Sequence, residues 1–205
     1  MHRALIPIVA FNAAYLLAAI GWVLASGNYE FLAYIAVVLV IGGVLLLIHR
    51  RVGLPLALLW CLSSWGLLHM AGGLLVVPAN WPVQGGSHAL YNWVLPGGWL
   101  KFDQAVHAWG FGITTWLCWA GLKSLLAEAG RPVRPGLGAM TLCVAASTGL
   151  GALNEVIEFT VTLLVPENNV GGYVNTALDL VYNLVGAIIA ALIIRLSHRR
   201  RTEPQ

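Results

Sequence analysis

Six apolar segments of about 20 residues constrain this chain more than any other feature of its sequence. An α-helix rises about 1.5 Å per residue, so a segment of this length crosses the roughly 30 Å hydrocarbon core of a bilayer. The residue-by-residue alternation of a transmembrane β-barrel is not found, and we therefore predict an all-α polytopic membrane protein. The expected spans are residues 5–26, 29–48, 54–77, 102–122, 137–165 and 174–196.

The composition excludes most soluble classes of protein. Apolar residues make up 59% of the chain and charged residues 9%, whereas soluble domains carry about 25% charged residues. Eleven Lys and Arg residues are too few to form the extended basic face of a nucleic-acid-binding protein. We predict a single six-helix transmembrane domain over residues 1–205, with membrane lipids and no nucleic acid as partners. Because the first apolar segment is too long for a typical signal peptide, we expect it to be retained.

The positions of the basic residues predict the orientation of the chain. If the six segments alternate in direction, ten of the eleven Lys and Arg residues lie on one side, and only Lys101 lies on the other. The positive-inside rule then places both termini in the cytoplasm. The long loop at residues 78–101 lies outside, where its three tryptophans are expected at the membrane interface and where it could cap the bundle. His88 in this loop is a further candidate to fold over a site.

Polar residues inside the expected spans gather near the outer end of the bundle. An Asp within a span costs at least about 2.5–3.5 kcal/mol, so such residues are functional candidates by default. Within each of the last three segments their spacing is i, i+3 or i, i+4, which places them on one helix face, whereas the third segment holds a single such residue. We estimate their depth as roughly 2–15 Å below the outer boundary. They are His69, Asp103, His107, Asn154, Glu155, Glu158, Asn175, Asp179 and Asn183.

The residue types in this group favour a divalent metal site. Imidazoles and carboxylates on facing helices suit Zn²⁺, Mn²⁺ or Fe²⁺, although neither a Glu-x-x-His pair nor an HExxH motif occurs. The predicted ligands are His69, Asp103, His107, Glu155, Glu158 and Asp179. One of the glutamates, Glu155 or Glu158, is left as the catalytic general base. Asn154, Asn175 and Asn183 are expected to orient ligands or to bind substrate.

Two other interpretations of the same residues remain open. Chains of Asp, Glu and His also form proton relays in transporters, although the inner half of this bundle holds no matching charges. Alternatively, these side chains join the helices by hydrogen bonds, without any ligand. A serine nucleophile is not indicated, because no Gly-x-Ser-x-Gly elbow is present.

The order of the motifs resembles that of the YjdF-like family of bacterial inner-membrane proteins. The resemblance rests on Asp103-x-x-x-His107, Glu155-x-x-Glu158, Asp179-x-x-x-Asn183-x-x-Gly186-Ala187 and His69-x-x-Gly72-Gly73, and it covers about residues 60–195. A looser likeness joins the chain to VanZ-like proteins of the cell envelope, from which it departs at Glu158 and Gln104. The resemblance implies a multi-pass protein of the bacterial inner membrane and supplies no reaction.

We therefore predict a metal-dependent hydrolase that acts on a membrane or envelope lipid from a site facing the periplasm. Two alternatives belong to other functional classes. A proton-coupled transporter or channel for a small solute would use the same residues for flux. A non-catalytic factor in envelope resistance or assembly would bind a partner protein and no metal.

Overall fold

The computed structural model describes residues 3–27, 30–164 and 171–202, and these residues form an all-helical fold. None of the described residues belongs to a β-strand. Two short 3-10 turns, η1 (Arg3–Leu5) and η2 (Leu90–Asn92), accompany the α-helices. The α-helices of the described residues are α1 (Ile6–Ser26), α2 (Glu30–Val52), α3 (Leu56–Leu74), α4 (Phe102–Glu128), α5 (Leu137–Leu164) and α6 (Tyr173–Thr202).

The length and composition of most helices fit a membrane. By these criteria α1, α2, α3, α5 and α6 are able to cross a bilayer, whereas α4 is not among them. The first turns of α4 carry Asp103, Gln104 and His107, which lower its hydropathy. Because α4 packs against α3, α5 and α6, these polar side chains face protein instead of lipid. The sixth span and the cytoplasmic position of both termini stay predictions.

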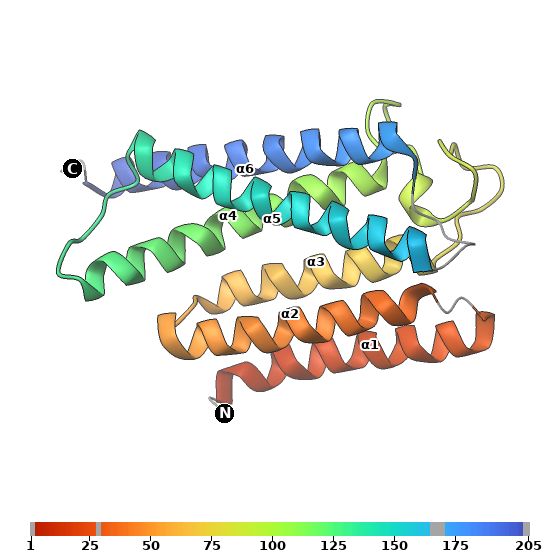
Figure 1. The fold of residues 1–205 in the computed structure, drawn as a ribbon, viewed down its shortest axis with the longest axis horizontal. Coiled ribbons are helices and arrows are strands. Elements are labelled where there is room, and N and C mark those ends of the chain that lie inside the picture. The colour runs from red at the N-terminus through yellow and green to blue at the C-terminus, as the bar shows by residue number, and fades with distance from the viewer. Residues whose placement is uncertain (1–2, 28–29, 165–170, 203–205) are drawn as a thin grey trace.

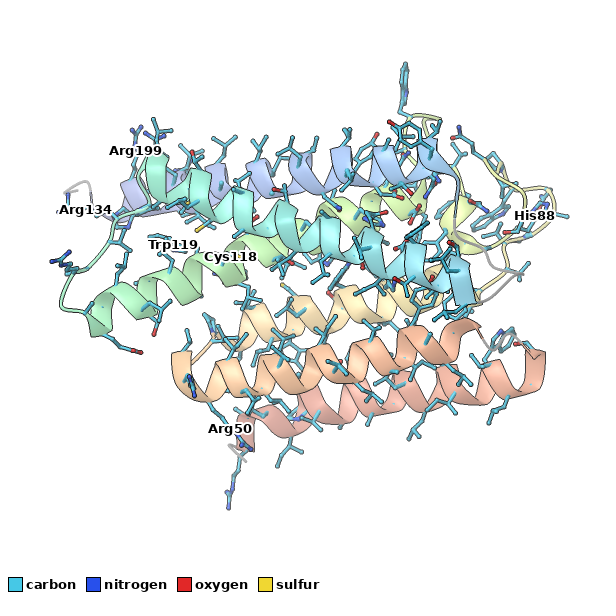
Figure 2. The ribbon with its side chains drawn as sticks, viewed as in Figure 1. Arg50, His88, Cys118, Trp119, Arg134 and Arg199 are labelled. Carbon is cyan, nitrogen blue, oxygen red and sulfur yellow. The ribbon has the colours of Figure 1, made fainter. Side chains whose placement is uncertain are left out.

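The helices form two groups that meet along α3 and α4. In Figure 1, α1, α2 and α3 lie in one half of the molecule and α4, α5 and α6 in the other. Both termini lie toward the same end of the bundle, and Figure 2 places Arg50, Arg134 and Arg199 there as well. We call this the basic end. The opposite, loop end carries the connection between α3 and α4, including His88 (Figure 2).

Glycines let these helices approach closely at particular points. A Cβ on Gly186 of α6 would lie 1.9 Å from the carbonyl oxygen of Ala108 in α4, so only glycine permits this approach. A Cβ on Gly151 of α5 would similarly meet Asn183 at 2.7 Å. Both glycines therefore lie where neighbouring helices approach closely. A Cβ on Gly149, by contrast, would meet no atom within 4 Å.

Several helix boundaries differ from the apolar segments. The third segment was expected to reach Val77, but α3 ends at Leu74 because the following backbone pairs with the loop. The amide of Val77 donates to the carbonyl of His88 at 2.8 Å, and that of Leu90 donates to Leu75 at 2.8 Å. Helices α4 and α6 continue beyond their apolar segments, since a helix does not end where a membrane does. The expected boundaries at residues 29 and 165 lie outside the described residues.

Candidate functional site

A cluster of buried polar side chains lies at the loop end of the bundle, where α4 and α6 begin. Asn183 and Asp179 of α6 are 0% and 1% exposed, and His107 of α4 is 3% exposed. The structure brings together most of the residues that the sequence singled out. We define the polar cluster as Lys101, Asp103, His107, Asn154, Glu155, Glu158, Asn175, Asp179 and Asn183.

His107 lies at the centre of the cluster, with polar neighbours near both ring nitrogens. Its Nδ1 is 3.0 Å from Oδ1 of Asn183 and 3.8 Å from Oε1 of Glu155. Its Nε2 is 3.6 Å from Oδ1 of Asp103, one helical turn earlier. With the Asn183 amide in this orientation, we assign the proton to Nδ1, which donates to Asn183. The lone pair of Nε2 is then on the side of Asp103.

Asn175 links the carboxylates of α4 and α6. Its Nδ2 donates to Oδ2 of Asp179 at 2.6 Å and to Oδ2 of Asp103 at 3.3 Å. Its Oδ1 accepts a hydrogen bond from Nζ of Lys101. Because each carboxylate uses its Oδ2 in these contacts, the two Oδ1 atoms remain for other partners.

Lys101 is a member of the cluster that the sequence interpretation did not include. Its Nζ is 3.6 Å from Oδ2 of Asp103, and its side chain is almost fully buried. A signal for this role was present, since Lys101 is the one basic residue expected on the outer side and lies two positions before Asp103. The ammonium group partly balances the negative charge of the carboxylates.

Two sets of potential cation ligands occur within the cluster. The ligand atoms of Asp103, His107 and Asp179 lie within 4.8 Å of one another. The ligand atoms of His107, Glu155 and Glu158 also lie within 4.8 Å of one another and form a second set. His107 belongs to both sets. Asn154, on the same helix as the two glutamates, donates to Oε1 of Glu158 at 2.8 Å.

Several buried atoms of the cluster have no hydrogen-bond partner among the residues that the structure describes. They are both carboxylate oxygens of Glu155, Oδ1 of Asp179 and Nδ2 of Asn183. Burial of a polar atom without a partner costs about 1–3 kcal/mol, and more for a charged group. The cluster therefore offers atoms for coordination or hydrogen bonding at the loop end of the bundle.

His69 lies outside both ligand sets, unlike the sequence expectation. Its ring packs among aromatic rings, with centroid distances of 5.6 Å to Tyr91, 6.1 Å to Trp65 and 6.2 Å to Tyr34. The i, i+4 pattern that grouped the other residues gave no information on how α3 is rotated, because His69 has no polar neighbour at that spacing. His88 is exposed at the loop end and does not fold over the cluster.

Tyr91 fixes the loop between α3 and α4 over the end of the bundle. Its hydroxyl donates to the carbonyl oxygen of His69 at 2.6 Å, and a Cβ on Gly72 would lie 2.3 Å from its ring. Burial raises the pKa of Tyr91 well above its ordinary value, and the carboxylates of Asp103 and Glu158 raise the pKa further. The hydroxyl therefore stays protonated and remains a donor at neutral pH.

Comparison with known proteins places the chain in a family. A family model described as "Predicted membrane protein (DUF2238)" matches residues 7–200, and the chain therefore belongs to this family. This is consistent with the resemblance to YjdF-like proteins, whereas the likeness to VanZ-like proteins gains no support. Searches of curated proteins and of solved structures found no match.

Proposed function

We propose that this member of the DUF2238 family binds a divalent metal ion in its polar cluster and uses it to hydrolyse a membrane or envelope lipid. One observation carries the proposal. The ligand atoms of Asp103, His107 and Asp179 lie within 4.8 Å of one another, while the buried Oδ1 of Asp179 has no hydrogen-bond partner among the described residues. A cation such as Zn²⁺, Mn²⁺ or Fe²⁺ would satisfy that oxygen.

The neighbours of these three residues support their role as ligands. A histidine that binds a metal commonly donates its other ring N–H to a neighbouring acceptor, and Asn183 Oδ1 accepts from His107 Nδ1 at 3.0 Å. Asn175 similarly holds the Oδ2 atoms of Asp103 and Asp179 and leaves their Oδ1 atoms for the metal. Three protein ligands would leave a coordination position open, as catalytic sites require.

Lys101 and the carboxylates balance charge in this scheme. The Lys101 ammonium is 3.6 Å from Oδ2 of Asp103, on the carboxylate oxygen that does not face His107. A divalent cation beside Asp103 and Asp179 would, together with Lys101, offset most of the negative charge of the four carboxylates in the cluster. Uncompensated charge in a low-dielectric interior is costly, so the cluster gains stability when a cation binds.

Glu155 is the candidate general base. Both of its carboxylate oxygens lack hydrogen-bond partners within the described part of the chain, and Oε1 is 3.8 Å from Nδ1 of His107. A general base needs to reach the proton directly or through one water, and this position is adjacent to the proposed ligands. The metal would supply Lewis-acid activation of a water or of the scissile group. Glu158, held by Asn154, would position the base.

The rest of the bundle favours hydrolysis over proton transport. Toward the basic end, the buried polar residues of α4 and α5 are Thr114, Thr115 and Ser147, and each hydroxyl donates to a backbone carbonyl. Among the described residues, the buried Asp, Glu and Lys side chains all belong to the cluster. A relay would need such groups along the whole path.

Lipid turnover by the purified protein tests this proposal. The wild-type protein in phosphatidylethanolamine and phosphatidylglycerol vesicles is treated with a chelator, and Mn²⁺ or Zn²⁺ is then added back while released products are measured by mass spectrometry. We expect turnover only with metal, and the same turnover in His88→Ala, which alters an exposed residue. Turnover that survives chelation, or tight metal binding without lipid or phosphoester cleavage, would overturn the proposal.

A further inference from the structure

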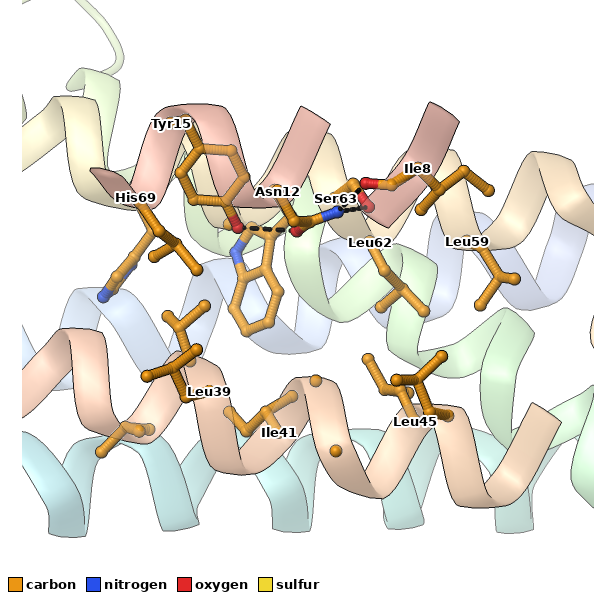
Figure 3. Close-up of a pocket in the computed structure, with 18 of the residues that line it drawn as sticks. Ile8, Asn12, Tyr15, Leu39, Ile41, Leu45, Leu59, Leu62, Ser63 and His69 are labelled. Carbon is orange, nitrogen blue, oxygen red and sulfur yellow. Dashed lines mark hydrogen bonds between the residues drawn. The ribbon is translucent and has the colours of Figure 1, made fainter. Parts of the chain in front are cut away.

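A cavity of about 460 Å³ lies between α1, α2, α3 and α5. Leu39 and Leu45 of α2 lie on one side of it, opposite Leu59 and Leu62 of α3 (Figure 3). Its volume falls within the range of about 300–1,000 Å³ that is typical of small-molecule sites. The cavity is therefore large enough to hold a ligand.

The wall of the cavity is apolar because its polar side chains are paired with one another. Nδ2 of Asn12 donates to Oγ of Ser63 at 2.7 Å and to the carbonyl of Ile8 at 2.7 Å, and the Tyr15 hydroxyl donates to Oδ1 of Asn12 at 2.9 Å (Figure 3). These contacts leave mainly aliphatic carbon on the surface. Such a wall suits a hydrocarbon and offers little to a hydrophilic solute.

The cavity opens onto helix surfaces of the kind that contact lipid. Three residues that line it, Leu39, Leu46 and Val9, have side chains that are 59%, 41% and 37% exposed. They lie on α1 and α2, which are among the helices able to cross a membrane. A ligand would therefore enter sideways from the bilayer.

One part of the cavity adjoins the polar cluster. His69 and Asn154 both line the cavity. Asn154 also donates to Oε1 of Glu158, whose carboxylate lies within 4.8 Å of ligand atoms of His107 and Glu155. Asn154 thus belongs to both features, and the cavity reaches the edge of the polar cluster.

We infer that this cavity binds an acyl chain of a membrane lipid and thereby places the lipid head group at the polar cluster. The inference rests on the proposed function and names its substrate class, a long-chain lipid cleaved at its head-group end. The acyl chain gains little from the hydrophobic effect, since it leaves a bilayer that is equally apolar. It binds because it makes dispersion contacts with the cavity wall that are missing when the cavity is empty. Contacts of the head group with the cluster then select the lipid.

Photolabelling tests the inference directly. The probe is a phosphatidylethanolamine with a diazirine on one acyl chain, added as a trace to phosphatidylethanolamine and phosphatidylglycerol vesicles that contain the protein. Gly42→Leu and Gly43→Leu fill the cavity, because both glycines line it and a Cβ at either meets no atom within 4 Å. Gly21→Leu is the control, because Gly21 is equally open and lies outside the cavity.

We expect wild-type labels to concentrate on cavity-lining residues and to fall by about fivefold or more in the two filled variants, as overpacking of a site predicts. Labelling of Gly21→Leu should match wild type. Even labelling of all lipid-facing helix surfaces, equal in the four proteins, would overturn the inference. Metal content, measured in parallel, separates the two proposals: a labelled cavity without bound metal refutes the proposed function, and bound metal without cavity labelling refutes only this inference.

Discussion

The two halves of the bundle treat their buried polar side chains differently. In the half formed by α1, α2 and α3, the side chains of Asn12, Tyr15 and Ser63 satisfy one another at 2.7–2.9 Å. In the half formed by α4, α5 and α6, Glu155 and Asp179 keep buried oxygens that none of the described residues contacts by a hydrogen bond. The three neutral side chains are thus paired with one another, whereas the two carboxylates are incompletely paired. In the first half, Nδ1 of His49, in the last turn of α2, is the buried side-chain atom without a hydrogen-bond partner among the described residues.

On the proposed function, this difference separates polar residues that join helices from residues that bind a ligand. Hydrogen bonds between membrane helices stabilise a bundle when both partners are satisfied. A group without a partner lowers stability, and such a cost is commonly retained where it serves function. The comparison predicts that substitutions lower stability in the first half and lower function in the second.

Glu155→Gln should have the largest effect, and it should act on function alone. Loss of the general base lowers lipid turnover by about 10²–10⁴-fold, while metal content stays at the wild-type level. Thermal unfolding in chelator should occur at the same or a higher temperature, because the amide removes an uncompensated buried charge. Glu128→Gln, at the exposed end of α4, serves as the control. Unchanged turnover would remove Glu155 from the mechanism.

Asn183→Ala should weaken metal binding without abolishing it. The variant loses the acceptor at 3.0 Å that fixes the His107 ring, and loss of such a partner typically lowers metal affinity by about 10–100-fold. Competition with a chromogenic chelator at constant pH measures the change. Thr160→Ala, whose hydroxyl donates to the backbone of its own helix, is the control. Equal affinities in Asn183→Ala and wild type would show that this contact is merely structural.

Asn12→Leu tests the comparison in the half of the bundle formed by α1, α2 and α3, where it should lower stability. The substitution leaves Tyr15 and Ser63 without their shared partner, and we expect the free energy of unfolding to fall by about 1–3 kcal/mol. Denaturation in detergent, followed by circular dichroism, measures this change, while metal content is read on the same samples. A variant as stable as wild type would mean that the two halves do not differ as proposed.

Tyr91→Phe should have the smallest effect. Loss of the hydrogen bond to the His69 carbonyl lowers stability by about 0.5–1.5 kcal/mol. Because burial raises the pKa of Tyr91, its contribution is complete below the ordinary tyrosine pKa of about 10 and is lost only as the pH rises through the raised value. The difference in unfolding temperature between wild type and variant should therefore be the same at pH 7 and pH 9. A difference that disappears by pH 9 would contradict this assignment.

Local periodicity accounts for what the sequence could predict. The i, i+4 spacing of Asp103 and His107 placed both on one face of α4, and the same spacing joined Asp179 and Asn183 on α6. Apolar length predicted all six α-helices of the described residues, but α4 is not among the candidate membrane spans, because its polar first turns lower its hydropathy.

Contacts between distant segments account for the rest. His69 was grouped with the ligands by residue type and depth, and the rotation of α3 directs it toward Tyr91 and Trp65. Lys101 and Tyr91 belong to a loop, whose path depends on backbone pairing that no periodicity reveals. The pairing of Asn12 with Ser63 likewise joins two helices 51 residues apart in the chain.

Metal content of the gently purified protein tests the central claim most directly. Elemental analysis would compare wild type with Asp179→Asn and His107→Ala, and Glu128→Gln would serve as the control. The account predicts about one equivalent of a divalent transition metal in wild type and control, and its loss in both ligand variants. A wild-type protein that is folded, has been supplied with Zn²⁺, Mn²⁺ and Fe²⁺, and still contains no metal would contradict it.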